Sequence, residues 1–365
     1  MKALFITADL GGNLPPTLAV ADALARRGLD VEIAGLEPGR TPHRGIDYPA
    51  ALSVSPEQGG KGLRKSRAML SLVAGRGAES TAAAIVSERA PSITIVDCML
   101  VAPLRGALTA GGRTAVLFHT FGNYWAGAFA RGPAGRALAL KGLGPLQLWR
   151  AADLRLMLTD PELDPGSRSP ALRDFTWAGT SEVGVAPVDR GERPRVLVSL
   201  SATDWPGMLP VYRQIIAALA ELPLDAVVTT GGVDLGGTLD GAPNVDVRDW
   251  VPHAGVLPAV DLVIGHGGHS TTMRALAHGL PVLVLPINPI SDQRLVGQTI
   301  EAAGLGSVLP RSAKAADIRA AVTAILADTE LRERAAATGS RLRETPSGGE
   351  VAAARIVALL RQSPR

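Results

Sequence analysis

Residues 3–34 read ALFITADLGGNLPPTLAVADALARRGLDVEIA and contain one complete strand–helix–strand unit. The apolar run 3–7 is short and ends at a glycine-rich turn, which is typical of a strand buried on both faces. Apolar residues then recur with helical spacing between residues 18 and 25, and Gly28 provides a helix stop. A second apolar run follows at 30–34. This order predicts the crossover unit of a parallel sheet.

The same alternation recurs along the chain. Short apolar runs stand at 93–96 and 114–118, and the pattern restarts at 195–200. Further strand-like runs lie at 226–229, 245–247, 261–264 and 281–285. Strands separated by helical segments predict an α/β fold with parallel sheets. We therefore predict two doubly wound, Rossmann-like domains that face each other across a cleft, because such folds bind ligands at the carboxyl ends of their strands.

Chain length and composition suggest where the domains end. A chain of 365 residues is long enough for about two domains. Residues 183–194 are rich in proline, glycine and charge, which is typical of a linker. We expect a first domain over 1–182, this linker, and a second domain over 195–346. The last segment, 347–365, contains an amphipathic helix that could pack back on the first domain.

The overall composition excludes several classes of protein. Hydrophobic residues make up 46% of the chain and charged residues 19%, so a disordered protein is excluded. The 37 basic and 34 acidic residues are too evenly balanced for nucleic acid as the main partner. Cys98 is the single cysteine, and the apolar run near the N-terminus stops at Asp9. We expect a cytoplasmic protein with no integral membrane segment and no intrachain disulfide.

The richest chemical pattern follows the apolar run that ends at Ile264. A turn of Gly265-His266-Gly267-Gly268 leads into a helix that starts near Ser270. Glycines let the backbone approach a ligand, and the amides and dipole of a helix N-terminus attract an anion such as a diphosphate. The pattern also fits an ordinary glycine turn with Ser270 as the helix cap. The sequence Trp250-Val251-Pro252, a short distance upstream, makes the combination more specific.

These motifs together resemble the nucleotide-sugar-dependent glycosyltransferases of the GT-B fold. The resemblance is to the bacterial natural-product group related to UDP-glucosyl and UDP-glucuronosyl transferases. It extends over nearly the whole chain and is strongest over 250–298. It implies inverting transfer of a sugar from a UDP- or TDP-sugar to a small apolar or aromatic acceptor. The nucleotide sugar is then a co-substrate, and the resemblance implies no cofactor.

The resemblance also implies roles for individual residues in the donor site. Trp250 is expected to stack on the nucleotide base, and the Val251 backbone to bond its edge. The remaining expected donor contacts are His266, Gly268, Ser270, Thr271 and Ser201 for the diphosphate, and Asp292 and Gln293 for the sugar hydroxyls. Structural alternatives stay open, since Trp250 could be a core aromatic, Ser201 a turn residue and Asp292 a helix cap.

Two positions depart from the family pattern. Arg274 stands where the family has a glutamate that holds the ribose hydroxyls, and an arginine has no acceptor atom. Asn13 stands where the family has its general-base histidine, and an amide has no useful proton affinity near neutral pH. Asn13 could still orient an acceptor or a water molecule.

Three explanations of the missing histidine remain open. Another residue could be the base: Asp97 if burial raises its pKa, His119, or Asp9, although each also fits a structural role. The acceptor could instead need little activation. Finally, the chain could be a catalytically silent GT-B protein that binds a nucleotide sugar or an aglycone as an auxiliary factor. Histidine, cysteine and acidic residues show no metal-binding spacing, so we expect no metal site.

Aromatic residues gather in one part of a chain that is only 4% aromatic. The resemblance implies that the acceptor binds in the first domain, and these aromatic residues predict that it is flat and apolar. The residues concerned are Phe118, Phe121, Tyr124 and Trp125. The same residues would equally fit a hydrophobic core or a contact between the subunits of a homodimer.

Overall fold

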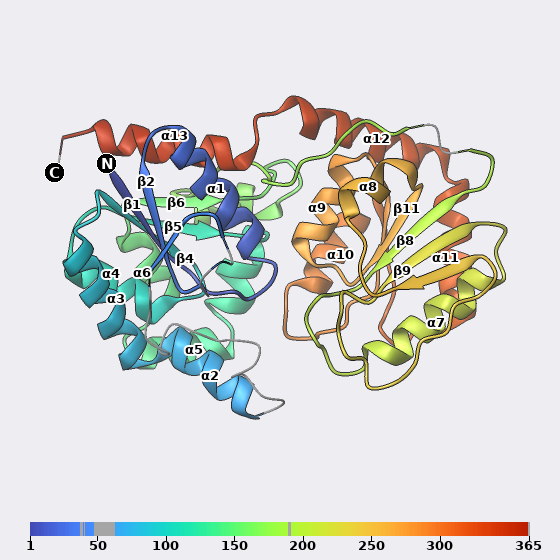
Figure 1. The fold of residues 1–365 in the computed structure, drawn as a ribbon, viewed down its shortest axis with the longest axis horizontal. Helices are drawn as coiled ribbons and strands as arrows, with labels where there is room; N and C mark the ends of the chain where they lie inside the picture. The colour runs from blue at the N-terminus through green and yellow to red at the C-terminus, as the bar shows by residue number, and fades with distance from the viewer. Residues whose placement is uncertain (37–38, 40, 47–62, 189–190, 364–365) are drawn as a thin grey trace. The chain divides into compact units, whose positions relative to one another are not determined.

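The computed structural model describes residues 1–36, 39, 41–46, 63–188 and 191–363, without the side chains of residues 63–67. The chain divides into two compact units (Figure 1). The first unit consists of Met1–Ser181 together with Pro346–Arg365, and the second of Glu182–Thr345. Within the described residues, no helix combines the length and the apolar character needed to cross a membrane.

The first unit is built on a parallel sheet of seven strands in the order β3-β2-β1-β4-β5-β6-β7. The strands are β1 (Lys2–Ile6), β2 (Asp30–Ala34), β3 (Arg44–Ile46), β4 (Ile93–Asp97), β5 (Thr114–Phe118), β6 (Leu154–Met157) and β7 (Thr176–Trp177). Central strands β4 and β5 are buried along their whole length, because helices cover both faces of the sheet.

The helices of the first unit follow the strands in chain order. They are α1 (Leu14–Arg26), α2 (Leu63–Ala74), α3 (Arg76–Arg89), α4 (Val101–Ala110), α5 (Pro133–Leu140) and α6 (Pro145–Ala151), with a π-helix at Tyr124–Phe129. Helix α1 forms because apolar residues occupy one face, and the prolines in its first turn lack only amides that would have no helical partner. Short 3-10 turns lie at Pro165–Arg168 and Pro170–Leu172.

The C-terminal helix α13 (Gly348–Arg361) completes the first unit and packs along α1 (Figure 1). The two helices approach closely at Gly349, where a Cβ atom would lie 2.7 Å from the carbonyl oxygen of Ala19. Ion pairs from Arg26 and Arg27 to Glu350 hold the start of α13. The segment after residue 346 therefore belongs to the first core rather than to the second.

The second unit has a parallel sheet of six strands in the order β10-β9-β8-β11-β12-β13. The strands are β8 (Arg195–Ser199), β9 (Asp225–Thr229), β10 (Val245–Arg248), β11 (Leu262–Gly265), β12 (Val282–Val284) and β13 (Gly306–Val308). The helices are α7 (Met208–Ala220), α8 (His253–Val256), α9 (His269–Ala277), α10 (Gln293–Ala302), α11 (Ala315–Ala327) and α12 (Thr329–Glu344), with a 3-10 turn at Leu257–Ala259.

The expected linker 183–194 is attached to this second unit where it is described. The amide of Val188 donates to the carbonyl of Pro258, and Gly184 lies so close to Ala277 that a Cβ atom would be 2.1 Å from its carbonyl oxygen. Residues 189–190 of this segment lie outside the described residues.

Two parallel-sheet α/β domains are thus confirmed, while the cleft between them remains a prediction. Each sheet has a point where the strand order reverses direction, between β1 and β4 in the first unit and between β8 and β11 in the second. Open α/β sheets bind ligands beyond the carboxyl ends of the strands at such points. Functional side chains are therefore expected at the carboxyl ends of the strands near these two points.

Candidate functional site

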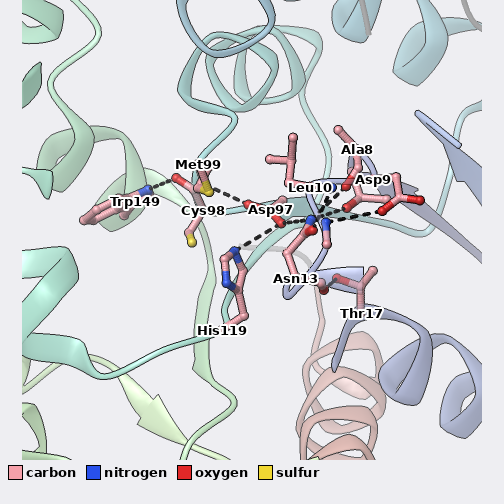
Figure 2. Close-up of polar contacts among 12 residues, drawn as sticks. Ala8, Asp9, Leu10, Asn13, Thr17, Asp97, Cys98, Met99, His119 and Trp149 are labelled. Carbon is pink, nitrogen blue, oxygen red and sulfur yellow. Dashed lines mark hydrogen bonds and ion pairs between the residues drawn. The ribbon is translucent and has the colours of Figure 1, made fainter. Parts of the chain in front are cut away.

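Three polar residues meet at the carboxyl edge of the first sheet, where its strand order reverses. Asp97 ends β4, Asn13 follows β1 at the start of α1, and His119 directly follows β5. The Asp97 Oδ2 atom accepts from the Asn13 amide at 2.8 Å and lies 3.5 Å from His119 Nε2. Figure 2 shows Asp97 between the other two side chains. The fold thus brings together all three predicted catalytic residues.

The Asn13 side chain is buried and bonded within the protein. Its Nδ2 atom donates to Asp97 and to the carbonyl of Ala8, each at 2.8 Å, with Thr7 Oγ1 at 3.3 Å. Its Oδ1 atom accepts from the amide of Leu10 at 3.1 Å. Because an amide nitrogen has only two protons, both are used by these contacts. Asn13 therefore fixes Asp97 and the turn after β1, and it does not point toward a ligand.

The pKa of Asp97 is lowered from its ordinary value. Burial alone would raise the pKa, but the charge of His119 and hydrogen bonds from His119, the Met99 amide and Asn13 outweigh it. The Met99 amide donates to Oδ1 at 2.9 Å. A carboxylate with a lowered pKa stays ionised near neutral pH and is a weak proton acceptor. The suggestion that Asp97 itself is the base required a raised pKa, and the pKa is lowered instead.

His119 is better placed than Asp97 to accept a proton from a bound acceptor. Its side chain is 13% exposed, whereas that of Asp97 is 1% exposed. The ring packs edge-on against Trp125, with centroids 5.2 Å apart. An ionised carboxylate beside an imidazole orients the ring and stabilises the protonated form. Asp9 takes a local role, because its Oδ1 atom accepts from the Gly11 amide in the same turn.

Asp97, His119 and Cys98 also form a group whose ligand atoms all lie within 4.8 Å of one another. Burial raises the pKa of the Cys98 thiol well above its usual value, and the charge of Asp97 raises it further. A metal ion would need the thiolate. The expectation of no metal site stays a prediction, because a bound metal ion would itself displace the thiol proton.

The predicted acceptor residues lie mostly in the core of the first unit. Phe118, Phe121 and Trp125 are at most 1% exposed, and Phe118 contacts Trp125 and Trp149 edge-on. They are core aromatics, as the alternative interpretation had it: Phe118 ends β5, Trp125 lies in the π-helix, and Phe121 lies between these two elements. Of the four residues, only Tyr124 is partly exposed. The acceptor site cannot be assigned from aromatic content alone.

The glycine turn between β11 and α9 lies at the corresponding edge of the second sheet. Gly267 has a φ of +86°, and a Cβ atom there would lie 2.5 Å from the carbonyl oxygen of Gln293. A Cβ atom on Gly268 would lie 2.6 Å from the ring of His266. Gly267 thus requires glycine, because its φ is positive and the added atom would meet backbone, whereas at Gly268 the added atom would meet only a side chain. The turn brings the first amides of α9 to the edge of the sheet, where a helix N-terminus favours an anion.

His266 occupies this turn as a neutral side chain. Burial lowers its pKa to about 4. Its Nδ1 atom is buried and has no hydrogen-bond partner among the described residues. A neutral imidazole still has one N–H donor, so His266 can donate to an anion without a metal ion.

Trp250 is the most exposed of the five tryptophans, of which Trp177 and Trp205 are partly buried. It is 69% exposed, whereas Trp125 and Trp149 are fully buried. It follows β10, so it stands at the same edge of the sheet as the turn before α9. The core alternative for Trp250 is therefore wrong, and an exposed aromatic ring is available for stacking. The neighbouring Val251 is buried.

Several other expected donor residues are already bonded to the protein. Ser201 accepts from the Thr203 amide at 2.9 Å, as a turn residue does. The Gln293 side-chain oxygen accepts from the amides of Ile287 and Asn288, each at 2.8 Å, so it holds a loop. Asp292 precedes α10 without capping it through its side chain. Thr271 is partly exposed in the first turn of α9.

Glu182 contacts two residues of α9 that the sequence had singled out, although no sequence feature pointed to Glu182 itself. Its carboxylate accepts from the Ser270 hydroxyl and, at 2.7 Å, from Arg274 Nε. Glu182 is 92 positions away from Arg274 in the chain. No motif links residues so far apart, and only the fold brings them together.

Comparison with known proteins relates this geometry to a group of enzymes. A family model described as erythromycin biosynthesis protein CIII-like, C-terminal domain, matches residues 213–359. Demethyllactenocin mycarosyltransferase of Streptomyces fradiae is 34% identical over 169 residues, which cover 45% of this chain and 35% of that protein. NDP-glycosyltransferase YjiC of Bacillus subtilis is 31% identical over 180 residues, which cover 48% of this chain and 44% of that protein. The chain thus spans less than half the length of each of these curated relatives.

Solved structures show the same fold over the whole chain. The glycotransferase of kitacinnamycin superposes with a TM-score of 0.77 at 22% identity, covering 98% of both chains. This likeness shows the fold of the chain, which has two parallel-sheet α/β units. Part of the chain is thus similar in sequence to bacterial natural-product glycosyltransferases, and the chain has the GT-B fold of the solved glycosyltransferases.

Proposed function

We propose that the protein transfers a sugar from a nucleoside diphosphate sugar to a small apolar or aromatic natural product. The names of the relatives support the coarse activity, since one is an NDP-glycosyltransferase and another a mycarosyltransferase. The sugar, the nucleotide and the acceptor are not fixed by these names. The donor is a co-substrate, and no cofactor is needed for the chemistry described below.

One observation carries the proposal: an exposed tryptophan, Trp250, stands at the same sheet edge as the glycine turn before α9. An aromatic platform suits a nucleotide base, and a helix N-terminus suits a diphosphate. The second unit therefore offers the two elements that a nucleoside diphosphate requires. The Val251 backbone, Thr271 and the amide of Gly268 are the further contacts that we propose for the donor.

The proposed reaction is an inverting transfer that relies on electrostatic stabilisation. The anomeric carbon gains positive character as its bond to the phosphate oxygen breaks. The leaving diphosphate gains negative charge at the same time. Fixed amide dipoles at the start of α9 and the N–H of His266 would stabilise that charge, as preorganised donors do in other enzymes. We propose that this replaces a metal ion.

We propose His119 as the general base and Asp97 as the residue that orients it. The acceptor hydroxyl would give its proton to the imidazole as it attacks the sugar. The lowered pKa of Asp97 supports this division of roles, because an ionised carboxylate stabilises the imidazolium that forms. Asn13 then has a structural part, holding Asp97 from the opposite side.

A second candidate function is a catalytically silent protein that binds a nucleotide sugar or an aglycone as an auxiliary factor. The observation in its favour is Asn13, whose amide protons are both used within the protein. In this case the donor site would bind its ligand without turnover.

Incubation with UDP- and TDP-sugars and a panel of phenolic aglycones, followed by mass spectrometry, tests the two functions. A glycosylated product is expected from the active enzyme. Calorimetric binding of UDP or TDP without any product would favour the silent protein. If neither nucleotide binds, the proposed donor site is wrong and both functions fail.

A further inference from the structure

A buried carboxylate that the proposed mechanism does not use lies against the loop that carries His119. Asp164 follows β6 and is fully buried in the first unit. Its Oδ2 atom accepts from the Gly122 amide and from Trp177 Nε1, each at 2.8 Å, and its Oδ1 atom accepts from the Gly166 amide at 2.7 Å. Three N–H groups from different segments of the chain therefore converge on one carboxylate.

Only one of these contacts is local. The bond from Gly166 caps the short turn Pro165–Arg168, as an aspartate commonly does. Gly122 and Trp177, in contrast, are 42 and 13 positions away from Asp164 in the chain. A cap needs one carboxylate oxygen. The second oxygen therefore ties the loop after β5 and strand β7 to this turn.

The three contacts explain why this buried position carries a carboxylate. Burial raises the pKa of Asp164, and a buried charge is unfavourable unless hydrogen bonds compensate for it. An ionised carboxylate has two acceptor oxygens and no donor, so it satisfies all three N–H groups. An asparagine has one acceptor oxygen, and its NH2 group would face at least one of these donors. Asp164→Asn therefore breaks the tie with almost no change in shape.

The tie fixes the far end of the loop that begins at β5. His119 directly follows β5, and Gly122 is three residues further along the chain. Thr120 and Phe121 between them are buried. A Cβ atom on Gly166 would lie 2.8 Å from the Cα atom of Gly122, so the two segments touch backbone to backbone. His119 is thus held between two fixed points, the end of β5 and the amide that Asp164 binds.

We propose that Asp164 is a positioning residue for His119, holding the loop after β5 so that His119 Nε2 stays 3.5 Å from Asp97 Oδ2. This inference rests on the proposed function, because it takes His119 as the base. Asp164 then contributes to turnover without touching the substrate. A displacement of about 1 Å at a reacting group costs on the order of a hundredfold in rate, so a small movement of this loop is enough to slow transfer.

A double-mutant cycle on the full chain separates positioning from a general loss of structure. Asp164→Asn is expected to lower kcat at least about tenfold. It should leave the affinity for UDP or TDP within about twofold of the wild type, because the proposed donor site lies in the second unit. In the His119→Ala background the same substitution should change kcat by less than about twofold, since a residue that acts only through His119 has no effect once that side chain is gone. Steady-state kinetics and calorimetry measure these quantities.

The matched control is Asp153→Asn. The Asp153 carboxylate accepts from the Thr114 amide at 2.9 Å, which is the same kind of bond at the opposite end of β5. This variant should leave kcat within about twofold of the wild type. Trp177→Phe removes one of the three donors from Asp164 and should lower kcat less than Asp164→Asn does. It takes the place of Asp164→Asn in the cycle if circular dichroism melting shows that the latter does not fold.

A measurement that needs no turnover distinguishes this inference from the proposed function. The His119 ring packs edge-on against Trp125, so the ring current of the indole makes the magnetic resonance signals of His119 sensitive to its position. With isotope-labelled histidine, and with His119→Ala to assign the signals, Asp164→Asn should shift the His119 signals and Asp153→Asn should not.

Each outcome then has one meaning. If the wild type forms no product, the proposed function is wrong, and the His119 signals alone decide the inference: a shift in Asp164→Asn supports it and unchanged signals overturn it. If the wild type is active, the inference is overturned when Asp164→Asn lowers kcat by the same factor with and without His119, because the loss is then a general one. Wild-type kcat in Asp164→Asn also overturns it.

Discussion

Asp97 shows at the scale of a single residue how neighbours decide chemistry. Burial would raise the pKa of this carboxyl group, yet His119, the Met99 amide and Asn13 together lower it. The sequence placed these residues among the candidates, Asn13 and Asp97 because they match positions of the family's catalytic pair and His119 because it follows a strand. It could not assign their roles, since the direction of a pKa shift depends on contacts between residues far apart in the chain.

The first prediction concerns this group. His119→Ala should reduce kcat by at least about a hundredfold, since a positioned base contributes that much or more. Asp97→Asn should cause a similar loss by disturbing the orientation of His119. The measurement is steady-state kinetics with a nucleotide sugar and an aglycone that gives product with the wild type.

A matched control for these variants lies in the same unit. His43 Nε2 and Asp22 Oδ1 form a second histidine–carboxylate pair, 2.6 Å apart, away from the ends of β4 and β5. His43→Ala and Asp22→Asn should leave kcat within about twofold of the wild type. Full turnover in His119→Ala, with donor affinity retained, would refute the assignment of the base. Asn13→His tests whether a histidine at that position increases transfer to oxygen acceptors.

His266 leads to a prediction about acid sensitivity. Its folded-state pKa of about 4 lies below the ordinary value of 6.5, so the unfolded chain takes up a proton at higher pH than the native protein. The free energy of unfolding should therefore fall as the pH drops from 6.5 toward 4, by at most about 3 kcal/mol from this residue. His266→Gln should reduce this dependence, as measured by urea unfolding between pH 7.5 and 4.

Other groups also titrate in this range, so the comparison must be between variants. Burial lowers the pKa of His253 and His278 too, and both lie in the second unit. His43→Gln in the first unit serves as the control. If His266→Gln keeps the full acid dependence of the wild type, the histidine is not buried as described here.

At the scale of the element, the turn between β11 and α9 joins sequence pattern and geometry most directly. The pattern His266-Gly267-Gly268 predicted a close backbone turn before a helix, and the structure has that turn. The sequence alone did not distinguish a turn that only caps the helix from a turn that binds an anion. The exposed ring of Trp250, which follows β10 at the carboxyl ends of the same strands, favours a nucleotide site, and exposure is a tertiary property.

Gly267→Ala is the test at this scale. The added Cβ would meet the carbonyl oxygen of Gln293 at 2.5 Å in a backbone with φ +86°, so the turn must shift. We expect nucleoside diphosphate affinity to fall at least about tenfold, because the α9 amides move with the turn. Gly236→Ala is the control, since its φ is +71° but nothing lies within 4 Å of the added atom. Equal affinities for UDP or TDP in both variants would show that this turn does not bind the nucleotide.

At the scale of the whole molecule, the chain leaves the first unit at Ser181 and returns to it at Pro346. The first core is therefore incomplete until the last helix has been made. Ile356 on α13 is fully buried, together with Ala352 and Ala353. The Gly348 amide also donates to the Thr180 carbonyl at 2.7 Å, which ties the returning chain to the departing one.

Ile356→Ala tests this dependence. It should destabilise the first unit by about 2–5 kcal/mol, the usual cost of removing a large aliphatic side chain from a core. The second unit has its own core and should keep its affinity for UDP or TDP. Leu140→Ala is the control, because Leu140 is 92% exposed. Urea unfolding followed by tryptophan fluorescence, with nucleotide titration in parallel, separates the two effects.

The sequence by itself determined the class of fold, because apolar periodicity and turn residues act between neighbours along the chain. It also determined the glycine turn and the candidates at the strand ends. Only the tertiary structure decided which aromatic side chains are core and which is exposed, that Asn13 and His119 meet at Asp97, and that Glu182 reaches Arg274. The reason is that burial and hydrogen-bond partnership arise between segments far apart in sequence, and these set both accessibility and pKa.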